Sequence, residues 1–476
     1  MRKSLWLFLI LLWTNVPAIA APPNVLFVLI DDMGYADLTC YGEKRVHTDQ
    51  VDRLAKEGIR FTQFYVNAPI CSPSRTALMT GQYPARWKIT SYLASRAENQ
   101  QRGMAQWLDP AAPTVARQLQ AAGYATGHFG KWHMGGQRDV GEAPLITEYG
   151  FEKTLTTFEG LGDRVLPMLD AYDGKPATQY ALGSDKLGRG NITWMERSKV
   201  TSAFVDGAIK FMQAAERENK PFYVDVWPDD VHSPFFPPKS LRGDESKKAL
   251  YLGVVQATDD QLAPLFDYVR SSPKLRDNTL IIVASDNGPE PGAGSAGRFR
   301  GHKGNLYEGG ISEPLIVWGP GLLARSAVGS TNNATVVAGV DFLPSILALT
   351  GAEPAEGKLM DGQDMSASLL GKESAKRTNP LFWLRPPDRP GPANDPFPDL
   401  AVREGDWKLL VNEDGTGTQL YDLAKDRVEK TNLANANPEI VTRLKKSVLD
   451  WRKTLPVERV SEKAQGPRVD LKDDAG

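Results

Sequence analysis

Cysteine and histidine are scarce in this sequence: its 476 residues include only two cysteines, Cys40 and Cys71, and five histidines. Two cysteines leave room for a single disulfide, which is the simplest expectation if the protein is exported. The alternative is that the two cysteines serve separate purposes, in which case Cys40 is expected to be a lone buried thiol.

An excess of charge of one sign is also missing. The 56 Lys and Arg residues nearly balance the 58 Asp and Glu residues, and the formal net charge is −2. No block of like charge occurs, so nothing indicates a nucleic acid or an anionic membrane as a partner. A small anionic substrate would therefore have to be bound by a few well-placed cations.

No long apolar run occurs after residue 20, so no membrane insertion of the mature chain is expected. Residues 1–20 have the pattern of a secretory signal peptide: Arg2 and Lys3, then the apolar stretch Leu5–Trp13, then small residues before Ala21. An uncleaved anchor is the alternative. The signal predicts export to the periplasm or the medium, and the absence of a cysteine after the cleavage site argues against a lipoprotein.

Short apolar runs alternate with helical patterns from residue 24 to about residue 350. This alternation predicts an α/β fold with a large, mostly parallel central sheet flanked by helices. Residues 155–195 show no steady period, and we predict a long loop region there. Strands are expected at Asn24–Ile30, Phe61–Tyr65, Tyr124–Phe129, Phe222–Trp227, Thr279–Ala284 and Leu315–Trp318, and helices at Val51–Gly58, Thr76–Thr80, Thr114–Ala122, Lys199–Glu218, Ala249–Ser271 and Val340–Leu349.

The composition and the pattern of apolar residues change after about residue 355. Arg385–Pro398 is proline-rich and is expected to be irregular. Antiparallel strands and a closing helix are expected beyond it, at Ala401–Val411, Gly417–Asp422 and Ile440–Arg452. The predicted organisation is a signal peptide (1–20), a large N-terminal domain (21–375), a smaller C-terminal subdomain (376–460) and a polar, disordered tail (461–476).

Polar side chains follow the carboxyl ends of several predicted strands, where the ligand crevice of an open α/β sheet lies. They are Asp31, Asp32, Lys131, His133, His232, Asp286 and Asn287. The carboxylate and amide oxygens in this set suit Ca²⁺ or Mg²⁺ better than zinc. Arg75, Lys131 and Lys303 would supply positive charge for an anion, and His133 and His232 would carry protons.

A short motif accompanies these polar residues, the run Cys71-Ser72-Pro73-Ser74-Arg75. The pattern C-x-P-S-R resembles the modification signature of the type I, formylglycine-dependent sulfatases of the alkaline phosphatase superfamily. Further stretches that resemble motifs of that family are NVLFVLIDDMGYADLTCYG, GYATGHFGKWHMG, HSPF, SDNG, GHKGNLYEGGISEP and the C-terminal GDWKLL and LYDL. One departure is Ser312, at a position where the family often has arginine.

The resemblance implies that a maturation enzyme oxidises Cys71 to formylglycine, an aldehyde that works as its hydrate. It implies Ca²⁺, with Mg²⁺ as the alternative, bound by Asp31, Asp32, Cys71, Asp286 and Asn287. Arg75 and Lys131 would steady the hydrate, and Lys131, His232 and Lys303 would contact the sulfate. One hydroxyl attacks sulfur, His232 protonates the leaving alcohol, and His133 assists the expulsion of sulfate.

The predicted function is therefore that of an exported sulfatase acting on sulfate monoesters. Export and the two loop-rich segments, 155–195 and 385–398, favour a carbohydrate sulfate as the substrate. The alternatives are an aryl sulfate substrate, a phosphonate or phosphate ester hydrolase on the same scaffold, and a non-catalytic protein that binds sulfated glycans. Regiochemistry, exo or endo action, oligomeric state and the roles of Asp229, Asp230 and His302 stay open.

Overall fold

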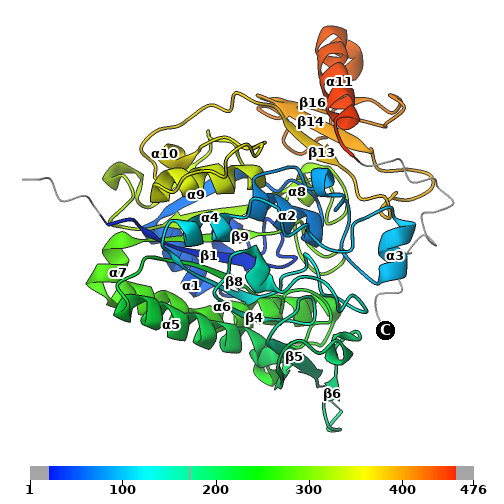
Figure 1. The fold of residues 1–476 in the computed structure, drawn as a ribbon. Helices are drawn as coiled ribbons and strands as arrows, with labels where there is room; N and C mark the ends of the chain where they lie inside the picture. Colours follow the sequence, from blue (N-terminus) through cyan, green and yellow to red (C-terminus); the bar gives the residue numbers. More distant parts are fainter. Residues whose placement is uncertain (1–20, 171–172, 457–476) are drawn as a thin grey trace, which may run out of the picture.

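The strand β1 (Asn24–Ile30) lies at the centre of the protein and is buried along its whole length, as its continuous apolar sequence predicts. Alternate side chains of β1 enter two separate cores. Val25 and Phe27 belong to the core on one face of the sheet, whereas Leu26 and Val28 belong to the core on the other face. A strand buried on both faces requires helices on both sides of the sheet, and Figure 1 shows this arrangement.

The sheet around β1 has twelve strands, ten of them in the order β11-β2-β10-β9-β1-β8-β3-β4-β5-β6, with β12 beside β2 and β7 beside β5. The consecutive strands β9, β1, β8, β3 and β4 are parallel, and β10 runs antiparallel between β9 and β2. The predicted fold class, a large and mostly parallel sheet, is confirmed. The bounds of these strands are β2 Ile59–Tyr65, β3 Ala125–Gly130, β4 Lys153–Thr156, β5 Arg164–Leu169, β6 Thr178–Gln179, β7 Ile192–Glu196, β8 Phe222–Trp227, β9 Thr279–Ser285, β10 Ser312–Trp318, β11 Ser330–Asn332 and β12 Val337–Ala338.

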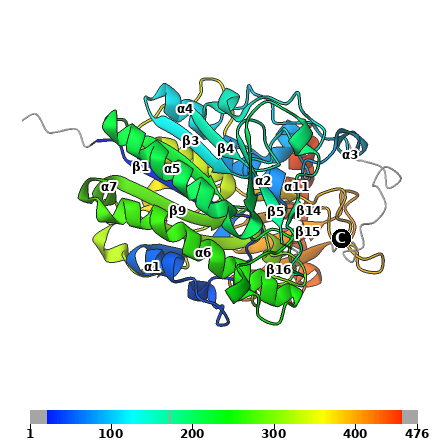
Figure 2. The same cartoon turned by 90° about the horizontal axis from the view of Figure 1, so that it is seen from below.

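Helices form a layer on each face of the sheet. The long helices α5 and α6 pack against each other on one face, and Figure 2 views the protein from that side. This layer consists of α1 Asp49–Glu57, α5 Val200–Arg217, α6 Lys247–Ser271 and α7 Pro273–Asn278, whereas the opposite layer contains α2 Cys71–Thr80, α4 Val115–Ala121, α9 Phe342–Thr350 and α10 Ser366–Leu369. Two short helices, α3 Arg96–Gln101 and α8 Glu308–Ile311, lie outside these layers.

A second, antiparallel sheet forms the C-terminal part of the chain, above α2 and α8 in Figure 1. The predicted antiparallel strands and closing helix are present, and Arg385–Pro398 contains no regular element, as expected. The boundary near residue 375 stays a prediction. The elements are β13 Leu381–Leu384, β14 Leu400–Glu404, β15 Trp407–Val411, β16 Gln419–Asp422 and α11 Pro438–Lys453.

The computed structural model describes residues 21–170 and 173–456. The predicted signal peptide (1–20) and the predicted tail (461–476) lie outside these described residues. Within the described ranges, every helix falls short of the length or the apolar character that crossing a membrane requires.

Two predictions about local structure are wrong. The predicted loop region 155–195 contains the strands β5, β6 and β7, which extend the sheet at one edge. These strands are short, and β5 pairs with β4, β6 and β7 without a regular alternation of apolar and polar residues, so the local sequence carries little periodic signal. The helix predicted at Thr76–Thr80 begins earlier, at Cys71. Pro73 is accommodated there because the first turn of a helix does not use the missing N–H.

A buried ion cluster joins the second sheet to the first. Lys408 on β15 lies 3.1 Å from Glu308 Oε1 and 2.8 Å from Glu429 Oε1, and all three side chains are buried. Arg427 contacts Glu308 as well, at 3.3 Å, and its Nη2 donates a hydrogen bond to Ser312 Oγ at 2.9 Å. A guanidinium from the C-terminal part of the chain thus lies beside the position where the family often has arginine.

Replacing Lys408 with methionine is expected to destabilise the protein by about 3 kcal/mol or more, because two buried carboxylates would lose their shared cation. The measurement is the midpoint of thermal unfolding, which should fall by several degrees. Lys425→Met is the matched control, since the Lys425 side chain is 84% exposed and pairs only with Asp422 in the described contacts. Equal midpoints for the two variants would contradict the importance of the cluster.

Candidate active site

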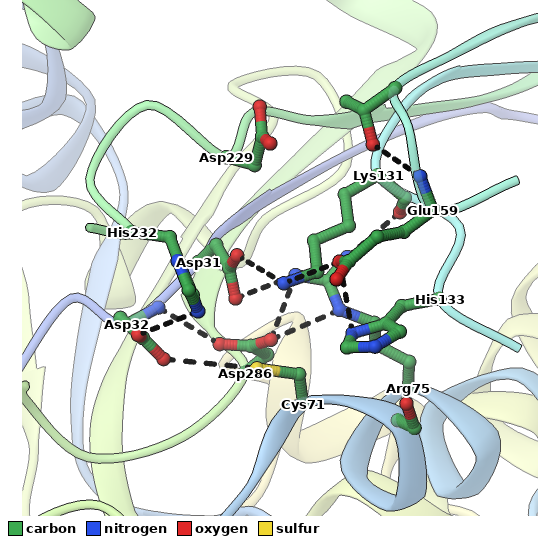
Figure 3. Close-up of polar contacts among 12 residues, drawn as sticks. Asp31, Asp32, Cys71, Arg75, Lys131, His133, Glu159, Asp229, His232 and Asp286 are labelled. Atoms are coloured by element: carbon green, nitrogen blue, oxygen red, sulfur yellow. Dashed lines mark hydrogen bonds and ion pairs between the residues drawn. The ribbon is translucent and has the colours of Figure 1, made fainter. Parts of the chain in front are cut away.

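The carboxyl ends of neighbouring parallel strands bring the predicted polar residues together at one edge of the sheet. β9, β1, β8 and β3 are consecutive and parallel, so their carboxyl ends meet at this edge. Figure 3 shows the acidic, basic and histidine side chains converging around Cys71. Asp31 and Asp32 follow β1, Lys131 and His133 follow β3, His232 follows β8, and Asp286 and Asn287 follow β9.

Three buried carboxylates form the centre of the site. One oxygen atom from each of Asp31, Asp32 and Asp286 lies within 4.8 Å of the others. The Asp32 N–H donates to Asp286 Oδ1 at 3.1 Å, and Asn287 Nδ2 donates to Asp32 Oδ1 at 2.7 Å. Asp32 has a left-handed backbone with φ of 56°, which aspartate adopts more readily than most residues. Carboxylates this close repel one another unless positive charge lies between or beside them.

Cys71 is the first residue of α2 and is 1% exposed. Its Sγ lies 3.8 Å from Asp32 Oδ1, which places residue 71 directly against the acidic centre. Burial, reinforced by the negative charge of Asp31, raises the pKa of the thiol well above its ordinary value. Both cysteines are free, so the disulfide considered as the simplest expectation is absent, and Cys40 is half-buried where full burial was expected.

Arg75 lies one turn along α2 from Cys71 and is fully buried. Its Nε and Nη2 donate to Asp286 Oδ2 at 3.0 and 2.8 Å, and its Nη1 donates to the Lys131 carbonyl at 2.9 Å. The guanidinium also lies over the ring of Trp227, 5.2 Å from its centroid. Arg75 Nη2 also lies 3.2 Å from Asp31 Oδ1. Arg75 thus contacts two carboxylates and holds the chain that follows β3.

Two lysines supply the remaining permanent positive charge. Lys131 Nζ donates to Asp31 Oδ2 at 2.7 Å, and Lys303 Nζ donates to Asp32 Oδ2 at 2.6 Å. Burial alone would raise the pKa of Asp31, but the charges of Lys131 and Arg75 outweigh burial and lower the pKa well below its ordinary value. Asp31 is therefore ionised at neutral pH.

The two predicted proton carriers lie in different surroundings. His232 is the more open, with a side chain 31% exposed and its Nε2 3.6 Å from Asp32 Oδ2. His133 is buried, and both of its ring nitrogens already face acceptors: Nε2 lies 2.9 Å from the Leu93 carbonyl and Nδ1 3.2 Å from Glu159 Oε2. A proton gained or lost by His133 must therefore move through Nε2, which faces the Leu93 carbonyl, or through Nδ1, which faces Glu159.

Glu159 is a site residue that the sequence analysis missed. Its Oε2 lies 3.0 Å from Lys131 Nζ as well as 3.2 Å from His133 Nδ1, and the residue is 5% exposed. The position of Glu159 in the sequence could have identified it, because it follows the carboxyl end of β4, which is parallel to β3. This indication was lost when the stretch from residue 155 was assigned to a loop.

Three residues whose roles were left open have partners inside the protein. Arg197 Nη1 donates to Asp229 Oδ1 at 3.0 Å and lies 3.4 Å from Asp230 Oδ1. Thr201 also donates to Asp230, so both carboxylates hold the chain that leads to His232. The His302 ring packs edge-on against Phe397, with centroids 6.1 Å apart, which indicates a structural contribution.

The acidic centre fits a divalent cation with a preference for oxygen ligands. Asn287 Oδ1 is buried without a hydrogen-bond donor, and the one cation beside Asp31 Oδ1 in the described contacts is Arg75, whose Nη2 lies 3.2 Å away. Burial together with the negative charge of Asp31 raises the pKa of Asp286. A cation would satisfy these oxygens and relieve the repulsion. Asp31, Cys71 and His232 also lie within reach of one ion. A cysteine ligates zinc as its thiolate, and burial beside Asp31 disfavours the thiolate of Cys71, so the oxygen-rich set is the better fit.

Comparison with known proteins adds a family match. A family model described as Sulfatase matches residues 23–352. Arylsulfatase A from Homo sapiens is 31% identical over 469 residues, covering 90% of this chain and 87% of that protein. N-acetylgalactosamine-6-sulfatase from Sus scrofa is 30% identical over 381 residues, covering 76% of this chain and 69% of that protein. The solved structure of Ps i-CgsB in complex with k-i-k-neocarrahexaose has the same fold, with a TM-score of 0.74 at 24% identity over 94% of this chain and 99% of that one.

Proposed function

This chain belongs to the sulfatase family and is a sulfuric ester hydrolase, and from that premise we propose that it removes sulfate from carbohydrates by way of a formylglycine made from Cys71. One observation carries the proposal. Cys71 Sγ, the atom that the aldehyde oxygen would replace, is buried 3.8 Å from Asp32 Oδ1 and adjoins the three carboxylates that fit a cation.

One hydroxyl of the formylglycine hydrate would attack sulfur as the bond from sulfur to the substrate alcohol breaks. The second hydroxyl would then lose its proton and re-form the aldehyde while the C–O bond to the bound sulfate breaks, a route that serine lacks. Cys71 also starts a helix, whose amino end favours negative charge on residue 71. A maturation enzyme must recognise the segment around Cys71 before the chain buries it, because the thiol is 1% exposed in the folded protein.

Asp31, Asp32, Asp286, Asn287 and residue 71 are the ligands that would hold a divalent cation here. Their oxygen donors fit Ca²⁺, which accepts more ligands and looser geometry than Mg²⁺. When bound, the ion supplies positive charge that lowers the pKa of the hydrate and orients it. Arg75 adds a permanent positive charge to the same site, because its guanidinium binds Asp286 and the Lys131 carbonyl.

The lysines and histidines would act on the ester itself. Lys131 and Lys303 approach the acidic centre with Nζ atoms that can donate to sulfate oxygens. His232 is the partly exposed group, so its Nε2 is suited to protonate the leaving alcohol at the mouth of the site. His133, buried against Glu159, would take up the proton released when sulfate is expelled.

The substrate class and the location of the enzyme are inferred from its relatives and from the sequence. One relative is an N-acetylgalactosamine-6-sulfatase, and one protein with the same fold binds a carbohydrate, k-i-k-neocarrahexaose. The first of these supports a sulfated carbohydrate, whereas the similarity to Arylsulfatase A keeps an aryl sulfate as the alternative substrate. We place the enzyme in the periplasm or outside the cell on the pattern of residues 1–20.

The test is a comparison of turnover on sulfated mono- and oligosaccharides, nitrophenyl sulfate and nitrophenyl phosphate, with enzyme co-expressed with a formylglycine-generating maturation enzyme. We expect kcat/KM to be highest for a carbohydrate sulfate and lowest for the phosphate ester. A preference for nitrophenyl sulfate over every sugar would make the protein an arylsulfatase. A preference for the phosphate ester would overturn the proposal. Activity on none of these substrates would favour the alternative of a non-catalytic protein that binds sulfated glycans.

A further inference from the structure

Glu159 places a carboxylate inside the site that the proposed reaction does not use. Figure 3 shows its carboxylate between Lys131 and His133, on the side of the site opposite His232. Its main chain is fixed independently of this side chain, because the His133 N–H donates to the Glu159 carbonyl at 2.7 Å and Gln137 pairs with Glu159 in a β-bridge. The side chain is therefore not needed to hold the loop in place.

Glu159 is a fourth carboxylate beside the three aspartates, and it lies outside the set of residues that would hold a cation. Arg75 pairs with Asp286 at 2.8 Å, Lys131 with Asp31 at 2.7 Å, and Lys303 with Asp32 at 2.6 Å. Among the described residues each of these three cations thus contacts at least one aspartate, and Arg75 Nη2 also lies 3.2 Å from Asp31 Oδ1. Glu159 then adds a second carboxylate to Lys131, at 3.0 Å. Burial alone would raise the pKa of Glu159, but the neighbouring His133 and Lys131 hold it low, at about 2, so Glu159 is ionised. Burial lowers the pKa of His133 to about 3, which leaves its ring neutral at the pH of the assay.

Lys131 is the amine that the proposed function places against the ester. With Glu159 beside it, Lys131 still donates hydrogen bonds but contributes little net charge to that part of the site. A sulfate monoester carries one negative charge, whereas a phosphate monoester carries about two at neutral or higher pH, because its second pKa is about 6. A reduced local charge costs the dianion more than the monoanion, since Coulomb energy scales with the charge of the ligand.

We propose that Glu159 is a specificity-determining residue that offsets the charge of Lys131 and thereby favours monoanionic sulfate esters over dianionic phosphate esters. The inference rests on the proposed sulfate ester activity. It assigns Glu159 a role that depends on its charge, whereas a structural role would depend on its size and shape.

The test compares Glu159→Gln, which removes the charge at constant size, with Glu159→Asp, which keeps it. The substrates are nitrophenyl sulfate, nitrophenyl phosphate and the nitrophenyl monoester of phenylphosphonate, assayed at pH 8. The phosphonate ester has phosphorus chemistry but one negative charge. Glu152→Gln, which removes an exposed charge from the same segment, is the matched control.

In Glu159→Gln we expect the kcat/KM ratio of phosphate to sulfate ester to rise about tenfold or more. The ratio of phosphonate to sulfate ester should stay near its wild-type value, and Glu159→Asp and Glu152→Gln should keep both ratios. An equal loss on all three substrates, or an equal change in both ratios, would overturn the proposal. Glu159→Met, of similar length, repeats the test if the glutamine variant does not fold.

A binding measurement separates this inference from the proposed function. Inorganic phosphate, largely dianionic at pH 8, should bind Glu159→Gln about tenfold or more tightly than wild type in calorimetry. Unchanged phosphate affinity would overturn the role of Glu159 whatever the substrates are. Conversely, a wild-type enzyme inactive on every sulfate ester would reject the proposed function while this binding shift still reports on Glu159.

Discussion

Replacing Cys71 with alanine should abolish sulfate ester turnover, with a loss of kcat of about 10⁴-fold or more, the scale on which removal of a covalent nucleophile acts. The fold should survive, because alanine suits the first turn of α2 and the Cys71 side chain makes only one polar contact, at 3.8 Å. The measurements are the initial rate on the best sulfate substrate and the midpoint of thermal unfolding.

Cys40→Ala is the control for this substitution, because Cys40 is a free, half-buried cysteine that is not among the residues placed in the site. We expect it to keep near-normal turnover. If Cys71→Ala kept near-normal turnover instead, residue 71 would not be the nucleophile, and the covalent mechanism would have to be abandoned.

Replacing Asp32 with asparagine should have the second large effect. Asparagine tolerates the left-handed backbone at this position and keeps the shape of the side chain, so the change is confined to one negative charge. Loss of a charged ligand should weaken Ca²⁺ binding by more than the roughly 10- to 100-fold that removal of an outer-shell partner costs. Turnover should fall by a comparable factor or more.

Calcium content per protein chain, measured by elemental analysis after dialysis against a fixed low Ca²⁺ concentration, reports this effect without an activity assay. Asp277→Asn provides the comparison, because Asp277 is an exposed acidic residue paired with Arg276. Wild-type calcium content in Asp32→Asn would show that this carboxylate does not ligate the ion. Loss of calcium from both variants would point to a general effect of charge.

The central strands were the most predictable part of the fold. Asn24–Ile30 and Phe222–Trp227 have the predicted bounds because a strand buried on both faces is apolar throughout and ends abruptly at polar residues. β5 and β7 were not predictable. They are short, Pro167 lies inside β5, and β5 pairs with β4, β6 and β7, so only the assembled sheet defines them.

The site was predictable to the extent that strand ends reveal it. Asp31, Asp32, Asp286 and Lys131 follow strands that the sequence identifies, so their convergence followed from the parallel order of the sheet. Lys303 follows no such strand and was assigned by resemblance to the family. Glu159 shows the cost of a missed strand, because the same rule applied after β4 would have included it.

The most direct test of the account is the mass of the tryptic peptide that contains residue 71, bounded by Arg60 and Arg75. For protein made together with a maturation enzyme, the account predicts a peptide that is lighter than the cysteine form by the exchange of CH₂SH for CHO and that reacts with an aldehyde-specific hydrazine. An unmodified Cys71 thiol in fully active enzyme, or a Cys40–Cys71 disulfide, would contradict it.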